Sequence, residues 1–198
     1  MKHVPLLAGS LVALAGFLGV VLAAGVQESA PSTREMTIGR DVSIEVQQGE
    51  KDYPFELSER EWRSRLSDFE YYVLREDGTE RAFANELYDN KQEGIYYSRA
   101  TGQPLFSSEH KYTSGTGWPS FWRPIDDDAV DYYIDRKMWM QRIEVTDSSS
   151  GSHLGHVFED GPEPTGLRYC LNSAALIFVA EGEEPPQIVK DYQARYGE

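Results

Sequence analysis

The chain of 198 residues contains a single cysteine, Cys170. One cysteine excludes an internal disulfide, and it excludes zinc sites built from several cysteines. The sequence can instead build an apolar core, because 40% of its residues are hydrophobic and 12% are aromatic. The aromatic content favours β-structure, since aromatic side chains pack well on pleated sheets.

The first 26 residues differ from the rest of the chain. Lys2 and His3 precede an apolar run from Val4 to Ala24, and polar residues follow. A basic start, an apolar middle and small residues after it are typical of a secretory signal. The run also approaches the length of a bilayer span, so an uncleaved membrane anchor is the alternative. Residues 1–26 are therefore expected to export the chain to an extracytoplasmic or periplasmic location, secreted or tethered.

The formal net charge of the whole chain is −14. A protein of this charge is repelled by phosphate backbones, which argues against sequence-independent binding of nucleic acid. The charge mainly favours solubility. A monomer is the expected oligomeric state.

The remaining chain divides by composition into three parts. Residues 27–57 are polar with sparse apolar positions, and we expect a tether with a short strand around Val42–Val46. Residues 58–182 contain the periodic patterns of a folded domain. Residues 183–198 are expected to form an acidic C-terminal extension that packs peripherally.

The folded part begins with two short predicted helices. Ser58 and Glu61 have the spacing of a capping box, which starts a helix. A second helix is predicted over Asp68–Leu74, and Asp77-Gly78 marks a turn after it. Short β-type runs separated by Gly-, Pro- and Ser-rich turns follow, which indicates one antiparallel β domain. The predicted strands are Gly94–Tyr97, Pro104–Ser107, Ala129–Asp135, Gln141–Val145, Leu154–Phe158, Arg168–Asn172 and Ala175–Ala180.

The cysteine lies in the predicted strand Arg168–Asn172. Because alternate residues of a strand share a face, Arg168, Cys170 and Asn172 point the same way. A cysteine between a cation and an amide donor is favoured as the reactive thiolate. The competing interpretation is an inert thiol in the core.

Two histidines, His153 and His156, lie close together in another predicted strand. Their spacing places them on opposite faces of a regular strand, but Gly155 between them could permit a bulge that turns both inward. Two histidines and a cysteine indicate a nucleophile with acid–base partners. Zinc ligands and solvent-facing histidines are the alternatives.

A glycine-rich loop, Ser114–Trp122, contains several aromatic residues. Such a loop can present Trp118 as an apolar wall for a small thioether-like group, because sulfur packs well against aromatic rings. Ordinary core packing is the alternative for Trp118 and more so for Phe121.

Taken in order, these motifs resemble the B-class methionine sulfoxide reductases from about Glu59 to Ala180. The matching segments are Arg75–Arg81, Tyr88–Asn90, Ser107-Ser108, Ser114–Phe121, His153–Phe158 and Gly166–Ala174. The resemblance implies a mainly β fold of two small antiparallel sheets with short N-terminal helices. It implies reduction of the R epimer of methionine sulfoxide in proteins and peptides, a reversible oxidation of methionine.

The resemblance also implies roles for individual residues. Cys170 aligns with the nucleophile that attacks the sulfoxide sulfur and becomes a sulfenic acid. His153 and His156 align with residues that hold the sulfoxide oxygen or a nearby water, and Asn172 with one that positions and activates the cysteine. The expected substrate-binding residues are Trp118, which packs on the substrate methyl group, Phe158, Arg168 near the nucleophile, and Asp160 as the partner of Arg168.

The sequence departs from the family pattern at two places. Many members bind zinc through two C-x-x-C pairs, and the matching positions here are Ser98, Thr101, Asp147 and Ser150. No zinc and no other cofactor is therefore expected. Many members also have a second, resolving cysteine where this chain has Thr116. An external thiol, such as a thioredoxin-like protein, is expected to reduce the sulfenic acid.

Three other functions compete with repair of oxidised exported proteins. A small-molecule-binding module on a related β fold needs a tryptophan-lined pocket but no nucleophile. A Cys–His hydrolase needs a third group to orient the histidine and an oxyanion hole. A structural protein without activity needs none of these groups, so the intact set of residues argues against it.

Overall fold

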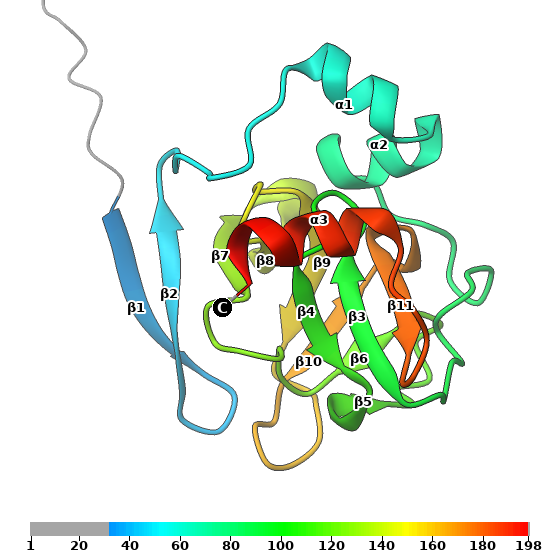
Figure 1. Ribbon diagram of the computed structural model, residues 1–198. Helices are drawn as coiled ribbons and strands as arrows, with labels where there is room; N and C mark the ends of the chain where they lie inside the picture. Colours follow the sequence, from blue (N-terminus) through cyan, green and yellow to red (C-terminus); the bar gives the residue numbers. More distant parts are fainter. Residues whose placement is uncertain (1–31, 198) are drawn as a thin grey trace, which may run out of the picture.

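The computed structural model describes residues 32–197 (Figure 1). The predicted signal or anchor, residues 1–26, lies outside the described residues. Within the described part, no helix is both long and apolar enough to cross a membrane.

A large sheet of eight strands forms one layer of the molecule. Its strand order is β1-β2-β7-β8-β9-β10-β6-β5, and every neighbouring pair is antiparallel except β2 with β7. The strands are β1 (Ser32–Ile38), β2 (Val42–Gln48), β5 (Lys111–Tyr112), β6 (Ser120–Phe121), β7 (Val130–Asp135), β8 (Arg142–Asp147), β9 (His153–Phe158) and β10 (Arg168–Leu171).

A second sheet of three antiparallel strands has the order β11-β3-β4. Its strands are β3 (Gly94–Ser98), β4 (Pro104–Ser107) and β11 (Leu176–Ala180). Three short 3-10 turns connect strands: η1 (Ser108–His110), η2 (Lys137–Trp139) and η3 (Ser173–Ala175). The predicted mainly β fold is confirmed, although one of its two sheets is larger than expected.

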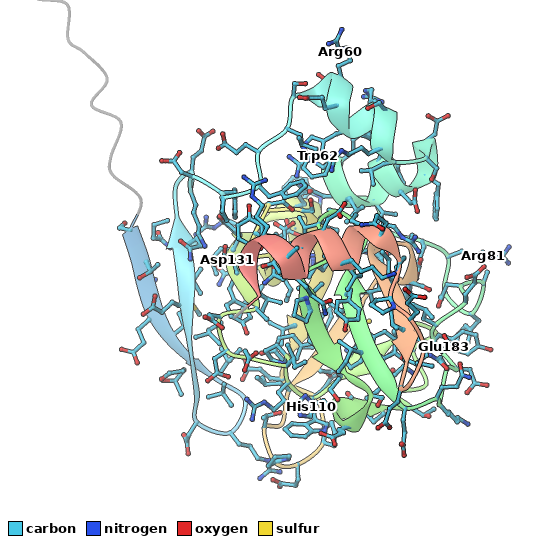
Figure 2. All side chains as sticks on the ribbon, in the orientation of Figure 1. Arg60, Trp62, Arg81, His110, Asp131 and Glu183 are labelled. Atoms are coloured by element: carbon cyan, nitrogen blue, oxygen red, sulfur yellow. The ribbon has the colours of Figure 1, made fainter. Side chains whose placement is uncertain are left out.

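Two short helices, α1 (Glu59–Arg65) and α2 (Asp68–Arg75), sit together at one end of the molecule (Figure 1). Both begin with a complete capping box, formed by Ser58 with Glu61 and by Ser67 with Glu70. Each box satisfies backbone N–H groups that a helix start leaves unpaired. On α1, Trp62 points toward the body of the domain and Arg60 into solvent (Figure 2), so the helix is fixed by one buried aromatic side chain.

The segment expected to be a polar tether, residues 27–57, is folded over most of its described length. Strands β1 and β2 form a hairpin that joins the large sheet through the pairing of Val46 with Tyr132 (Figure 1). Ile44 and Val46 lie on one face of β2 and are buried with Ile38 in the core. Burying each such side chain stabilises the fold by roughly 1.5–3 kcal/mol, which explains why a mostly polar segment docks. The predicted strand around Val42–Val46 is present. The described part of the expected polar tether, however, forms a hairpin that packs on the domain.

The C-terminal extension contains a helix that the sequence did not reveal, α3 (Gln187–Tyr196). Figure 1 shows α3 lying across the three-stranded sheet. Val189 is fully buried in a small cluster with Tyr97 and Val179 of that sheet. The helix therefore covers the outer face of β3 and β11.

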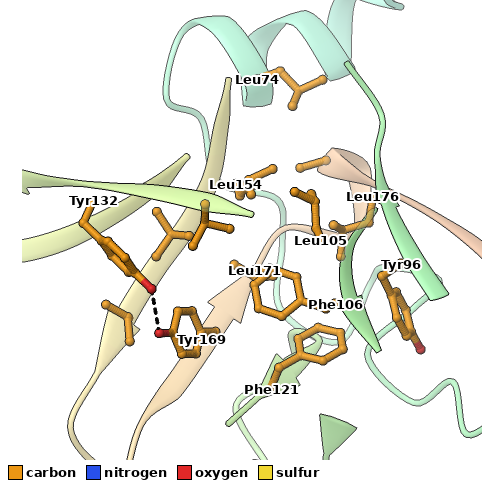
Figure 3. Packing of buried hydrophobic residues seen from close by; sticks show 14 of the residues in the cluster. Leu74, Tyr96, Leu105, Phe106, Phe121, Tyr132, Leu154, Tyr169, Leu171 and Leu176 are labelled. Carbon is orange, nitrogen blue, oxygen red and sulfur yellow. Dashed lines mark hydrogen bonds between the residues drawn. The ribbon is translucent and has the colours of Figure 1, made fainter. Parts of the chain in front are cut away.

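The main core fills the space between the two sheets (Figure 3). Rings from both sheets meet there, with centroids 4.7 Å apart for Phe106 and Phe121 and 4.9 Å for Tyr96 and Phe121. The hydroxyl groups of Tyr132 and Tyr169 are 2.8 Å apart and satisfy one another inside the core. The buried rings hold β10 rigidly against its neighbours, which matters because β10 carries the cysteine.

Candidate active site

The cysteine opens into a small cavity of about 140 Å³ on the large sheet. Its walls come from β8, β9 and β10, the loop before β6 and the segment after α2. The cavity is lined by Thr79, Trp118, Arg142, His153, Gly155, His156, Phe158, Cys170, Leu171 and Asn172. Six of the eight site residues predicted from the sequence therefore share one cavity; the other two, Arg168 and Asp160, lie beside it.

Strand β10 alternates as predicted. Tyr169 and Leu171 are buried in the core, whereas Arg168 and Cys170 face the other side and are partly exposed. Arg168 donates two hydrogen bonds to the carboxylate of Asp160, at 2.8 and 2.9 Å. Its guanidinium also lies 4.3 Å from the ring centre of Phe158, the residue that it opposes across the strand pair. The expected pairing of Asp160 with Arg168 is present.

The thiol of Cys170 differs from the expected thiolate. Burial raises the pKa of the Cys170 thiol above its ordinary value of 9.0. A contact with the Thr116 hydroxyl, 3.9 Å from Sγ, and the charge of Arg168 both lower this pKa, but they do not outweigh burial. The cation acts in the predicted direction, and the prediction failed because it neglected the cost of removing a charged sulfur from water.

A bulge in β9 turns both histidines to the cysteine's side of the sheet. Val145 pairs with Gly155 and Thr146 pairs with His153, so Leu154 is an extra residue in β9. The rings of His153 and His156 consequently lie 5.4 Å apart. This is the bulge that the sequence allowed next to Gly155, and the close approach of Gly155 to the Cys170 carbonyl leaves no room for a side chain there.

His153 is held by a carboxylate that the sequence did not single out. Its Nδ1 lies 2.6 Å from Oε1 of Glu144 on β8, and its side chain is 2% exposed. A carboxylate accepts hydrogen bonds, so Nδ1 carries the proton and Nε2 is left as an acceptor in the neutral ring. Nε2 is buried and has no partner within the described residues. A buried nitrogen without a partner in a cavity wall is a contact point for a bound group.

His156 is held in a different way. Its Nε2 lies 2.9 Å from Oδ2 of Asp135, which also accepts a bond of 2.6 Å from Arg142. Burial lowers the pKa of His156, and Asp135 opposes that shift. Burial alone would raise the pKa of Asp135, but hydrogen bonds from the Lys137 backbone, His156 and Arg142 lower it to about 2. Asp135 is therefore a permanent anion at neutral pH.

Asn172 is bound to backbone groups rather than to the cysteine. Its Oδ1 accepts from the Glu80 N–H at 3.0 Å, and its Nδ2 donates to the Leu154 carbonyl at 3.1 Å. The Glu80 carbonyl in turn accepts from the indole N–H of Trp118 at 3.2 Å. Asn172 thus connects β9, the segment after α2 and the tryptophan wall, and it lines the cavity without a hydrogen bond to Cys170.

Two groups of side chains could be considered for a metal ion. Asp77, Glu144 and His153 each offer a ligand atom within 4.8 Å of the others. Hydrogen bonds already use this group, because Asp77 is paired with Lys137 and Glu144 with His153 Nδ1.

The positions of the family's zinc cysteines form the second group. Asp147 is fully buried and accepts hydrogen bonds from the hydroxyl groups of Ser98 and Thr101 and from the Ser149 N–H. Ser150 bonds to Ser152 instead. These oxygen atoms satisfy one another, so the cluster connects β3, the turn after it and the end of β8 without a metal ligand of the thiolate type.

Larger cavities lie elsewhere on the described part of the chain. One of about 640 Å³ lies between the β1–β2 hairpin and the domain, and one of about 740 Å³ lies near β3 and β11. No histidine or cysteine lines either of them. The small cavity at Cys170 is therefore the place where nucleophile and acid–base groups converge.

Sequence reasoning missed the residues that hold the histidines. Glu144, Asp135 and Arg142 matter because β7 and β8 pair beside β9, with Glu144 directly opposite His156. A signal was present: Arg142 and Glu144 alternate with apolar residues in the predicted strand, which marks a polar face. Thr79 and Glu80 lie in the matching segment Arg75–Arg81, but no regular periodicity there indicated that either side chain or backbone belongs to the site.

The part of the chain that forms the cavity is similar to known proteins. A model of the SelR domain matches residues 66–180, which contain every residue of the cavity. A relative from Methanosarcina mazei, named peptide methionine sulfoxide reductase MsrB, is 57% identical over 126 residues, or 64% of this chain and 90% of the relative. Relatives of the same name from Hahella chejuensis and Leptospira interrogans are 53% and 49% identical, covering 61% and 66% of this chain and 87% and 99% of theirs.

The β1–β2 hairpin and α3 lie outside the residues that the domain model matches. The match covers more than half of the chain and nearly the whole length of these relatives. Cys170, His153 and His156 all lie within it. The chain therefore belongs to the SelR domain family, the MsrB peptide methionine sulfoxide reductases.

Proposed function

We propose that this protein reduces methionine-R-sulfoxide in oxidised proteins and peptides, with Cys170 as the nucleophile. The observation that carries the proposal is one row of side chains across three strands. Glu144 opposes His156, and His156 opposes Cys170, so all three share one face of the sheet, where His156 and Cys170 line the cavity. A thiol facing two histidines that are each held by a carboxylate is suited to nucleophilic attack coupled to proton transfer.

In the first step, the Cys170 sulfur attacks the sulfoxide sulfur, and the bond formed between the two sulfur atoms breaks again when the oxygen moves to the cysteine. The thiol gives up its proton, the sulfoxide sulfur–oxygen bond breaks, and the oxygen is transferred to the cysteine. The products are a thioether, which is methionine, and a sulfenic acid on Cys170, so the sulfoxide is reduced and the thiol is oxidised. Because burial raises the pKa of Cys170, this step needs a base for the thiol proton.

His153 Nε2 supplies that base in the proposal, because it is buried without a hydrogen-bond partner among the described residues and His153 lines the cavity. It accepts the thiol proton and returns it to the sulfoxide oxygen, whose basicity increases as the bond breaks. Glu144 stabilises the ring while it carries a positive charge. Trp118 and Phe158 form the apolar wall for the methyl and thioether groups of the substrate.

The second half of the cycle uses a thiol from outside the chain. The sulfenic acid condenses with an external thiol to give a mixed disulfide and water, and a second thiol releases reduced Cys170. A thioredoxin-like protein is the reductant that we propose, since the sequence contains no second cysteine. Residues 1–26 are the expected signal or anchor. We therefore propose that the protein is an exported monomer, secreted or tethered, and that it repairs oxidised proteins outside the cytoplasm.

The experiment is turnover of N-acetyl-methionine-R-sulfoxide amide with dithiothreitol, with the S epimer in parallel. The protein is the chain from residue 27 onward, beside a Cys170→Ser variant. Turnover of the R epimer alone, abolished in the variant, supports the proposal. A folded protein that reduces neither epimer would contradict it and would favour a small-molecule-binding module on the same fold.

A further inference from the structure

Two large aromatic side chains beside the active-site cavity are exposed to solvent on a strained backbone. Phe83 is 60% exposed at φ +61°, and Trp139 is fully exposed at φ +63°. Bulky residues rarely adopt this left-handed region, because Cβ crowds the following carbonyl. Phe83 keeps one edge contact with the Tyr88 ring, at 5.8 Å between centroids, but the exposure of both side chains on a strained backbone needs another explanation than core packing.

Trp139 is anchored to the cavity wall from both sides of its loop. The loop leaves β7 at Asp135, which binds His156, and enters β8 at Arg142, which lines the cavity. Arg142 donates a hydrogen bond to Asp135, so the two ends of the loop are held together. Two residues lie between Trp139 and Arg142, so three peptide steps limit the distance between their Cα atoms to about 10 Å. Met140, the next residue, is 58% exposed.

Phe83 is anchored on another side of the same cavity. Its N–H donates to the Gly117 carbonyl at 2.9 Å, and a side chain at Gly117 would meet the Phe83 ring. Gly117 directly precedes Trp118, the aromatic wall of the cavity. Phe83 and Trp139 therefore belong to two different segments, each of which adjoins a residue of the cavity lining, Trp118 or Arg142.

We propose that Phe83, Trp139 and Met140 form a docking rim for the residues that flank methionine sulfoxide in an extended polypeptide. The inference rests on the proposed function and deepens it. The volume of the cavity indicates what binds at the rim. A cavity of about 140 Å³ accommodates a group about as large as benzene, so only the sulfoxide side chain of the substrate enters it. The neighbouring residues of the substrate must lie outside, against this rim, and an apolar rim selects apolar neighbours.

The test compares peptides that differ only beside the sulfoxide. Their central residue is methionine-R-sulfoxide, flanked on each side by leucine or by glycine, with N-acetyl-methionine-R-sulfoxide amide as a substrate without neighbours. For the unsubstituted protein, we expect kcat/KM to be about fivefold or more higher for the leucine peptide than for the glycine peptide, mainly through KM. Trp139→Ser and a Phe83→Ser, Trp139→Ser double variant should remove this ratio, and Trp139→Phe should restore part of it.

The control is Arg136→Ser, a polar substitution at an exposed position in the same loop, which should leave the ratio as it was. Equal ratios in the unsubstituted protein and Trp139→Ser would overturn the docking rim. So would a dimer that covers these residues, seen by size-exclusion chromatography as a concentration-dependent species that Trp139→Ser abolishes. Failure of the proposed function looks different, because the unsubstituted protein would then reduce none of the three substrates.

Discussion

Glu144 Oε1 lies 2.6 Å from His153 Nδ1, and this contact leaves the other ring nitrogen of His153 without a partner among the described residues. An acidic partner does two things for an imidazole. It fixes the tautomer, and it stabilises the positive charge that the ring acquires when it takes a second proton.

Glu144→Gln should therefore lower kcat by about 10- to 100-fold with a smaller effect on KM. The amide oxygen can still accept from Nδ1, so the ring stays in place while the charge is lost. Steady-state turnover of the R sulfoxide as a function of pH measures the effect. Glu45→Gln, the same change at an exposed position on β2, is the control; equal kcat values for the two variants would show that the charge of Glu144 is not used.

The reactivity of Cys170 should depend on the charge of Arg168. The cation lowers the pKa of a thiol that burial has raised, so Arg168→Gln should raise that pKa further. The pH dependence of iodoacetamide alkylation measures it, with the midpoint above 9.0 in the unsubstituted protein and higher still in the variant. Arg168→Lys keeps the charge and should change the midpoint less; a lower midpoint in Arg168→Gln would contradict the assignment.

Acid should remove a contribution that Asp135 makes to stability. The pKa of this carboxyl falls from 3.8 to about 2 on folding, so its contribution is complete above about pH 4 and is lost as the pH falls through about 2. Asp135→Asn should lower the free energy of unfolding by about 1–2 kcal/mol at pH 7. Urea unfolding from pH 7 to 2 should show the difference shrinking in acid, and Asp128→Asn, at an exposed site, should show no such trend.

The buried carboxylate of Asp147 should be important for stability rather than for chemistry. Asp147→Ala leaves the hydroxyl groups of Ser98 and Thr101 and the Ser149 N–H without their acceptor. Unsatisfied buried groups of this kind predict a loss of about 3 kcal/mol or more in the free energy of unfolding. Urea unfolding measures the loss. Asp52→Ala, at an exposed position, is the matched substitution and should change stability little.

Relief of backbone strain should make Trp139→Gly more stable than the unsubstituted protein. Glycine adopts the left-handed region without a steric penalty, and the expected gain is about 0.5–1 kcal/mol after its larger unfolded-state entropy is counted. Trp139→Ala retains Cβ and should not show the gain. Thermal unfolding followed by circular dichroism compares the three proteins. A less stable Trp139→Gly variant would mean that the indole supports the fold.

Local signals predicted most of the fold. The capping residues Ser58 and Glu61 and the alternation in β10 act within a few neighbours, and both are as predicted. The hairpin β1–β2 was missed because its stabilisation comes from distant contacts of Ile44 and Val46 with the core, in a segment that is otherwise polar.

The candidate site could likewise be predicted only in part, because some of its residues are recognisable by type and others depend on the fold. Cys170 and the histidines stand out by residue type, whereas Glu144 and Asp135 are brought next to the histidines only by the register of three neighbouring strands. The protonation state of Cys170 was misjudged for a related reason, since burial is a property of the folded domain and not of the strand.

The arrangement of the two histidines depends on the number of residues in β9, because β9 contains one residue more than its partner strand at the bulge. Side chains in a regular strand alternate, so His153 and His156 share a face because Leu154 is inserted between paired positions. Exchanging one apolar side chain for another at Leu154 leaves that count unchanged, whereas deleting one residue would turn one imidazole away from the sulfur. The arrangement of the two histidines therefore tolerates substitutions in this strand far more readily than insertions or deletions.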